Sequence, residues 1–200
     1  MKKAYFVAWM FVAAFPVFVP NFTDAETGND NAYIAQNSRF FEELEIRFLN
    51  IMNLARQDPA KFAETYLAGR VNKGAKYAEL YRRMKEIPPV APLRPSKALS
   101  LAARDHVRDM FAARVEEKKE TGPRWARIEK YAKWEGHVAV SRSYGYSDPD
   151  NIVVHLLLNA GDPAKSNMLD PRSRFSGSRI GKNKHYRYMC VVYFAANIRE

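Results

Sequence analysis

The stretch PLRPSKALSLAARDHVRDM, residues 92–110, decides the fold of this 200-residue chain. Ser96 suits a helix N-cap, because its hydroxyl oxygen can accept a hydrogen bond from a backbone N–H group of the first helical turn. After Ser96, side chains at helical spacing form one stripe, which consists of Leu99, Ala102, Ala103, His106, Met110 and Ala113. The pattern predicts a helix with His106 on its inner face, directed toward the core or toward a cleft.

Upstream of this stretch, the sequence predicts three more helices and a connector. Residues 39–57 carry apolar side chains at helical spacing, and Ser38 is the expected N-cap. Asp58-Pro59 ends this helix and begins the next, because the residue before a proline avoids the helical region and proline suits a first helical turn. Residues 74–87 predict a short helix, and residues 88–95, PPVAPLRP, predict an extended connector without a helix or strand of its own.

Downstream, short helices and strands alternate until two strands close the chain. We predict a short helix at residues 126–134, a strand from Gly136 onward, and a helix that follows the cap Asp148 and ends at Gly161. Residues 173–182 and 186–195 predict a closing pair of strands. This order predicts an α+β fold, an α-β-α sandwich in which helices flank an antiparallel sheet. The expected core contains Phe62, Leu99, Ala103, Val153, Leu157, Val191 and Phe194.

The first twenty residues, MKKAYFVAWMFVAAFPVFVP, place two lysines before an apolar run. This order is typical of a secretory signal peptide. Thr23 and Ala25 form a small-x-small site, so we expect residues 1–25 to be removed, residues 26–38 to be a flexible lead-in, and residues 39–200 to form one domain. The protein is therefore predicted to be secreted or periplasmic. The alternative is an uncleaved N-terminal membrane anchor, although Pro16 and Pro20 interrupt a continuous spanning helix.

Composition limits the partners and the redox chemistry of the chain. Its formal charge of +10 favours anionic partners. For an exported protein these are lipid head groups, anionic envelope components or acidic proteins, and nucleic acid is not expected. Cys190 is the single cysteine, so no disulfide can form within the chain, and its setting YMCVVYFA indicates a buried strand. The sequence contains no P-loop, dinucleotide-binding, zinc-finger or helix-turn-helix pattern.

Four segments of the chain, in order, resemble the CAP superfamily of cysteine-rich secretory, antigen five and pathogenesis-related proteins, whose domain is also called the SCP domain. The segment IMNLARQDPAKFAETYL resembles a helix pair of the family through Asn53, Arg56, Pro59 and Phe62. The segment PLRPSKALSLAARDHVRDM resembles the family helix that carries a histidine, and RIEKYAKWEGHVAVSRSYG resembles a strand region. NMLDPRSRFSGSRIG and HYRYMCVVYFA are similar to the closing strands. The resemblance covers residues 40–195 and implies a secreted, extracellular α-β-α domain.

The resemblance also implies a central cleft, in which two histidines and two glutamates of the family can hold a divalent metal. The first histidine position is His106 in this chain. The glutamate of the family's G-E-N motif falls on Val140, and the histidine of its H-R-x-N motif falls on Ala164. Valine and alanine cannot ligate a metal, so we expect no metal site and no cofactor. An acidic pair that precedes this loop in relatives reads Asn159-Ala160 here.

Two functional hypotheses follow from these residues. In the first, the protein is a pseudoenzyme that binds a lipid, an anionic envelope component or a protein partner, and His106 is a scaffold residue hydrogen-bonded to a backbone carbonyl. In the second, the protein is a metal-dependent hydrolase with a rebuilt site at His106, the residual catalytic candidate. The second hypothesis requires a one-residue bulge that turns Glu135 or His137 toward His106. The sequence leaves the oligomeric state and the identity of the ligand open.

Overall fold

The computed structural model describes residues 30–112 and 125–200, with side chains from Glu42 onward within those ranges. Residues Gln36–Glu200 form one compact unit. The predicted signal peptide, residues 1–25, lies outside the described residues, and so does Ala113 of the predicted helical stripe. Within the two described ranges, no helix is both long and apolar enough to cross a membrane.

Helices and strands follow one another in an order close to the predicted one. The elements are α1 (Asp30–Gln57), α2 (Pro59–Phe62), the π-helical turn η1 (Ala63–Leu67), the 3₁₀ helix η2 (Ala68–Lys73), α3 (Ala75–Met84), β1 (Arg94–Pro95), α4 (Lys97–Asp109), α5 (Ala126–Glu129), β2 (Lys133–Tyr144), α6 (Pro149–Asn159), the 3₁₀ turn η4 (Pro163–Lys165), β3 (Phe175–Asn183) and β4 (Arg187–Arg199). The fold class is α+β, as predicted.

Side-chain caps fix the starts of three helices where the sequence predicted them. The Asp58 carboxylate accepts from the Lys61 N–H at 2.9 Å, and the Ser96 hydroxyl accepts from the Leu99 N–H at 3.2 Å. Asp148 caps α6 in the same way. The predicted cap at Ser38 is wrong, because α1 begins at Asp30. The residues between them, DNAYIAQN, contain neither glycine nor proline, so nothing in this stretch interrupts a helix.

The sheet has four strands in the order β1-β3-β4-β2. β4 lies between β3 and β2 and pairs antiparallel with both of them. The sequence predicted this antiparallel arrangement from the two closing strands and the strand after Gly136. The sheet as a whole is mixed, because β1 pairs parallel with β3.

The connector at residues 88–95 forms a strand that the sequence analysis did not predict. Arg94 and Pro95 make up β1, and the Arg94 N–H donates to the Arg174 carbonyl at 2.8 Å. The prediction failed because proline argues against a strand, and the partner residues lie about eighty positions away in the sequence. Proline is tolerated in an outer strand, where its missing N–H removes no bond that the sheet needs.

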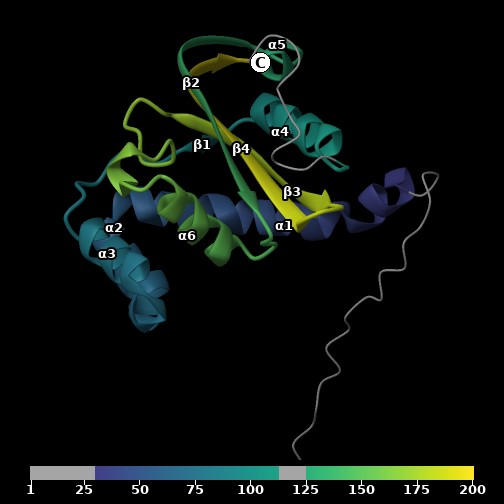
Figure 1. Ribbon diagram of the computed structural model, residues 1–200. Coiled ribbons are helices and arrows are strands. Elements are labelled where there is room, and N and C mark those ends of the chain that lie inside the picture. The colour runs from purple at the N-terminus through teal and green to yellow at the C-terminus, as the bar shows by residue number, and fades with distance from the viewer. Residues whose placement is uncertain (1–29, 113–124) are drawn as a thin grey trace, which may run out of the picture. The chain divides into compact units, whose positions relative to one another are not determined.

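The four strands lie between two layers of helices (Figure 1). Helices α4 and α5 cover one face, and α1 and α6 lie on the other. Successive residues of β4 therefore point to opposite layers. One set packs with α4 and consists of Met189, Val191, Tyr193 and Ala195. The other set is also fully buried and consists of Cys190, Val192 and Phe194.

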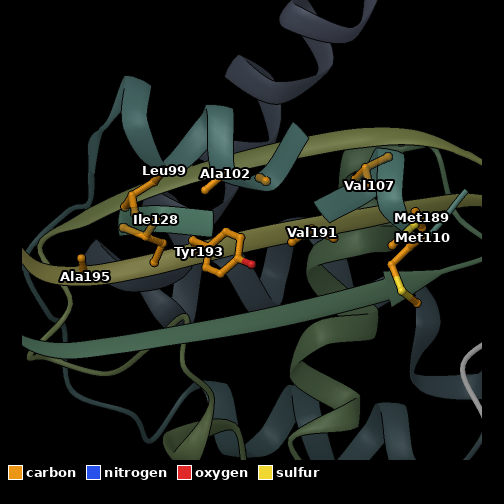
Figure 2. Packing of buried hydrophobic residues seen from close by; sticks show 10 residues of the cluster. Leu99, Ala102, Val107, Met110, Ile128, Met189, Val191, Tyr193 and Ala195 are labelled. Carbon is orange, nitrogen blue, oxygen red and sulfur yellow. The ribbon is translucent and has the colours of Figure 1, made fainter. Parts of the chain in front are cut away.

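The packing between α4 and the sheet forms one continuous cluster. Figure 2 shows side chains of α4, including Leu99, Ala102 and Val107, over the row that β4 contributes. Ile128 of α5 closes the cluster at one end. The predicted core is confirmed, because each of its members is fully buried: Phe62, Leu99, Ala103, Val153, Leu157, Val191 and Phe194.

On the α1 side of the sheet, the carboxyl group of Glu45 is largely covered, with 15% of its side chain exposed. Glu45 accepts a hydrogen bond from the Ile180 N–H at 3.2 Å and lies 3.5 Å from the Arg179 guanidinium. Burial raises the pKa of Glu45 from 4.5 to about 7, although Arg179 and the Ile180 N–H both act in the opposite direction. The carboxyl group of Glu45 is thus protonated in the folded protein at pH values where an exposed glutamate is ionised.

This pKa shift predicts a pH dependence of stability that Glu45→Gln removes. A raised folded-state pKa contributes stability that is complete below pH 4.5 and is lost as the pH rises through about 7. We therefore expect Glu45→Gln to gain stability relative to wild type over this interval, by a total on the order of 3 kcal/mol. Urea unfolding at a series of pH values measures the difference. Glu43→Gln, at an exposed glutamate of α1, is the control, and a constant difference between Glu45→Gln and wild type would contradict the shift.

Candidate functional site

His106 lies inside the molecule, between α4 and β4. Its side chain is 1% exposed, and its Nδ1 lies 2.8 Å from the Tyr193 hydroxyl. The two rings are 5.8 Å apart and tilted by 46°. The sequence analysis correctly placed His106 on the inner face, but it expected a backbone carbonyl as the hydrogen-bond partner of the ring. The Tyr193 hydroxyl was missed because the partner comes from a strand 87 residues further along the chain.

The other two positions of the family site are Val140 and Ala164. Val140 is paired with Tyr193 in the sheet, and its side chain packs against the cluster beneath α4, on the same side as His106. Ala164 is exposed on η4, in a segment that contacts the other side of β2. Asn167, three residues later, donates to the Ser141 hydroxyl at 3.1 Å, and Ser141 alternates with Val140 along β2.

The irregularity that a rebuilt site would need is present in β2. The pairing of β2 with β4 shifts register between Glu135 and Val138, around Gly136, which has a φ of 77°. Glu135 forms an ion pair with Arg199 at the surface. The His137 Nε2 atom lies 3.4 Å from the Asp170 carboxylate. The bulge therefore directs both candidate residues to partners other than His106.

His155 forms a second polar cluster, on α6. Its Nδ1 lies 2.9 Å from the Ser143 hydroxyl, and the Asn159 amide is 3.3 Å from the ring. Burial and, to a smaller extent, the charge of Lys76 lower the pKa of His155. Ser143 is 0% exposed, so its hydroxyl is not accessible for attack on a substrate. The cluster holds α6 against β2.

A recess of about 250 Å³ opens where β2, α6 and the segment after η4 meet. Its walls are Ser141, Arg142, Leu156, Asn159, Ala160, Lys165, Ser166 and Asn167. Six of these positions belong to the three family motifs in which the chain has substitutions: Ser141, Asn159, Ala160, Lys165, Ser166 and Asn167. The recess is therefore built largely from the positions that the sequence analysis compared with the family cleft.

Lys165 is the cationic side chain among the walls of the recess, and no carboxylate is among them. The Arg142 side chain alternates with that of Ser141 along β2 and lies on the α4 side of the sheet, with Val140 and Tyr144. Arg142 interacts with Tyr144, whose pKa burial raises and whose phenol the Arg142 guanidinium contacts. Asp162 begins the turn that carries Lys165, but it lies 2.9 Å from Arg83, and this hydrogen bond lowers the Asp162 pKa more than any other contact. The local charge of the recess is positive.

Metal ligation is poorly supported within the described part of the chain. No three side chains of histidine, cysteine, aspartate or glutamate there are grouped so that they could hold an ion. His106, Val140 and Ala164 contribute one possible ligand between them. The donor set at these positions does not fit a zinc-like ion.

A family model described as the cysteine-rich secretory protein family, CAP, matches residues 77–195. The chain belongs to the CAP family. The match covers more than half of the chain and includes α4, most of the sheet and the recess. No curated protein is significantly similar to this CAP-family chain in sequence.

Two solved structures are similar to this CAP-family chain. An outer surface protein from Borrelia burgdorferi has 14% sequence identity and a TM-score of 0.41, with 53% of this chain and 78% of that chain covered. A cysteine-rich secretory protein from Staphylococcus aureus has 14% identity and a TM-score of 0.46. In that comparison 78% of this chain and 39% of the staphylococcal chain are covered, so the chain spans well under half of that protein.

Two motif residues of the first helix have structural roles in this CAP domain. Asn53 holds the connector, since its amide donates to the Leu93 carbonyl at 3.0 Å and accepts from the Leu93 N–H at 2.8 Å. Arg56 is 0% exposed, and its guanidinium donates to four backbone carbonyls, those of Ala91, Met168, Asp170 and Ser173. The sequence analysis noted both residues as part of a family motif but did not predict these contacts.

Proposed function

We propose that this CAP-family protein is exported and acts by binding a partner, not by catalysis. The observation that supports the proposal is that the family's metal-ligand positions do not form a metal site in this chain. His106 is buried and bonded to Tyr193, Val140 is aliphatic, and Ala164 is exposed on a turn. A metal-dependent hydrolase needs three or four converging ligands and an open coordination position, and these residues supply neither.

The proposed partner is a lipid, an anionic envelope component or a protein with an acidic surface. The formal charge of +10 supports an anionic partner, because a cationic surface raises the local concentration of anions. The recess between β2 and α6 supports the same preference, since Lys165 and no carboxylate line it. Export is supported by the two lysines and the apolar run at the N-terminus, with removal expected after Ala25.

The alternative, a hydrolase rebuilt at His106, receives one favourable observation. The bulge that it requires does occur between Glu135 and Val138. However, Glu135 is engaged by Arg199 and His137 lies beside Asp170. Moving His137 to form a metal site would separate its Nε2 atom from the Asp170 carboxylate, which lies 3.4 Å away. We therefore prefer the binding function.

The purified exported protein tests both parts of this proposal. Its intact mass is expected to correspond to a chain that begins at Glu26, and a mass that includes Met1 would instead indicate the anchored form. Calorimetric titration with zinc is expected to give no stoichiometric binding, and the His106→Ala variant is expected to behave identically. Tight binding of one zinc ion that His106→Ala abolishes would contradict the non-catalytic proposal and support the hydrolase.

A further inference from the structure

The recess beside β2 has the donors of an anion-binding site. Polar residues from three parts of the fold line it: Ser141 from β2, Asn159 from α6, and Lys165, Ser166 and Asn167 from η4 and the residues after it. Donors that converge from several elements surround an anion, whereas donors on one surface meet only one side of it. This arrangement distinguishes the recess from a general cationic surface.

The positive charge at the recess is not neutralised by the nearest carboxylate. Lys165 is exposed at the end of η4, and Asp162, three residues earlier, lies in the same turn. Arg83 holds the Asp162 carboxylate at 2.9 Å, and the Ala164 N–H also donates to it at 3.1 Å. The Asp162 carboxylate is thus directed mainly to α3 and to its own turn, and Lys165 makes the smallest of the contributions that lower the Asp162 pKa.

The two serines of the recess are arranged as donors. The Ser141 hydroxyl accepts from the Asn167 amide at 3.1 Å, and the Ser166 hydroxyl accepts from the Met168 N–H at 3.3 Å. A hydroxyl group that accepts one hydrogen bond still carries its own O–H donor. Ser166 is 5% exposed, so a ligand that accepts its O–H would bind inside the recess and not on the outer surface.

We propose that this recess binds a phosphate group, an inference that rests on the proposed binding function and specifies its ligand. A carboxylate presents two coplanar oxygens, which one arginine can satisfy. Phosphate presents oxygens in several directions and matches donors that come from β2, α6 and η4. A lysine ammonium supplies the point charge that phosphate sites commonly use. The volume of about 250 Å³ lies below the range of about 300–1,000 Å³ of pockets for drug-sized ligands, so a small head group fits best.

The test uses glycerol 3-phosphate as a soluble probe and the full exported protein at constant ionic strength. Wild type is expected to bind one molecule of glycerol 3-phosphate with a saturable isotherm. Lys165→Ala is expected to weaken the affinity about tenfold, because a charge-assisted hydrogen bond is lost. Lys97→Ala is the matched control: it removes the same charge from an exposed lysine of α4, on the opposite face of the sheet, and is expected to change the affinity less than about twofold.

Vesicles distinguish the two sources of the phosphate group. Phosphatidylcholine vesicles with and without phosphatidylglycerol are mixed with wild type, Lys165→Ala and Lys97→Ala. Binding to phosphatidylglycerol that depends on Lys165 supports a lipid head group as the ligand, and Lys165-dependent binding of the soluble probe alone supports a free phosphate ester. Thermal unfolding of each variant verifies that it is folded, and Lys165→Gln provides a second substitution at the same position.

Two results would overturn the inference. One is the absence of saturable binding of both probes, and the other is an equal loss of affinity in Lys165→Ala and Lys97→Ala, which would indicate a general cationic surface. If wild type and the two variants bind the soluble probe equally and also bind the vesicles equally, the phosphate site is refuted while the proposed binding function stands. The zinc titration tests the non-catalytic proposal independently of the phosphate site, because its outcome depends on His106 and not on Lys165.

Discussion

Replacing Arg56 with methionine is expected to lower the free energy of unfolding by about 3–5 kcal/mol, which is a large part of the stability of an ordinary domain. Methionine keeps much of the volume and the helix propensity of arginine but has no donor. The carbonyls of Ala91 and Met168, each 2.6 Å from the guanidinium, would lose their donor, as would those of Asp170 and Ser173. Buried acceptors left without a donor carry the full cost of their desolvation.

The Arg56 experiment has a matched control in Arg82→Met. Arg82 lies on the exposed side of α3 and pairs with Glu79 and Glu86. Surface ion pairs of this kind contribute little, so the unfolding midpoint of Arg82→Met is expected to lie close to that of wild type. Urea unfolding compares the two variants with wild type. If Arg56→Met and Arg82→Met shift the midpoint equally, the four carbonyl contacts are not the source of the stability.

Replacing Gly177 with alanine is expected to be comparably damaging, with a loss of at least about 3 kcal/mol. A Cβ atom on Gly177 of β3 would lie 2.2 Å from the Ser100 nitrogen and 2.4 Å from the Leu99 carbonyl carbon. Both are backbone atoms of α4, so the helix can avoid the new methyl group only by moving away from the sheet. This displacement would open the cluster that α4 forms with β4 and would loosen the contact between His106 and Tyr193.

Two other glycines make the Gly177 prediction specific. At Gly69 nothing lies within 4 Å of the added atom, so Gly69→Ala is expected to leave stability nearly unchanged. At Gly181 the obstacle is the Val107 Cγ1 atom at 2.6 Å, which belongs to a side chain. Val107→Ala should therefore rescue Gly181→Ala, whereas Leu99→Ala should not rescue Gly177→Ala. Thermal unfolding measures all of these variants, and rescue of Gly177→Ala by Leu99→Ala would show that the backbone contact is not limiting.

Local signals in the sequence predicted most of the elements. Ser96, Asp58 and Asp148 each cap a helix through a hydrogen bond to a residue three positions later, and such caps depend only on neighbouring residues. The apolar run around Cys190 likewise predicted a buried strand, and Cys190 is 0% exposed. Signals of this kind depend on a few neighbouring residues, and they were sufficient to predict the α+β fold class.

Features that depend on distant residues were not predictable in this way. Pairing of Arg94 with Phe175 makes β1 a strand, and nothing near Arg94 indicates that partner. The contact of the Tyr193 hydroxyl with His106 and that of the Glu45 carboxyl with Ile180 were unpredictable for the same reason, because the two partners come from different elements. The recess was also missed, since β2, α6 and η4 form it together. The motif substitutions at Asn159 and Lys165 were the available signal for it.

Glu45 and Asn167 have a common consequence for two open edges of the sheet, one along β2 and one along the part of β3 that the two-residue strand β1 does not pair with. The Ile180 N–H of β3 and the Val140 carbonyl of β2 point away from β4, and a strand of another molecule could pair with such open edges. Glu45 occupies the first group and the Asn167 amide occupies the second, at 3.2 Å in each case. Each bond lies within its strand and not at its end. These two side chains therefore occupy backbone groups that a strand of another molecule would need for edge-to-edge pairing, and they disfavour aggregation through these edges.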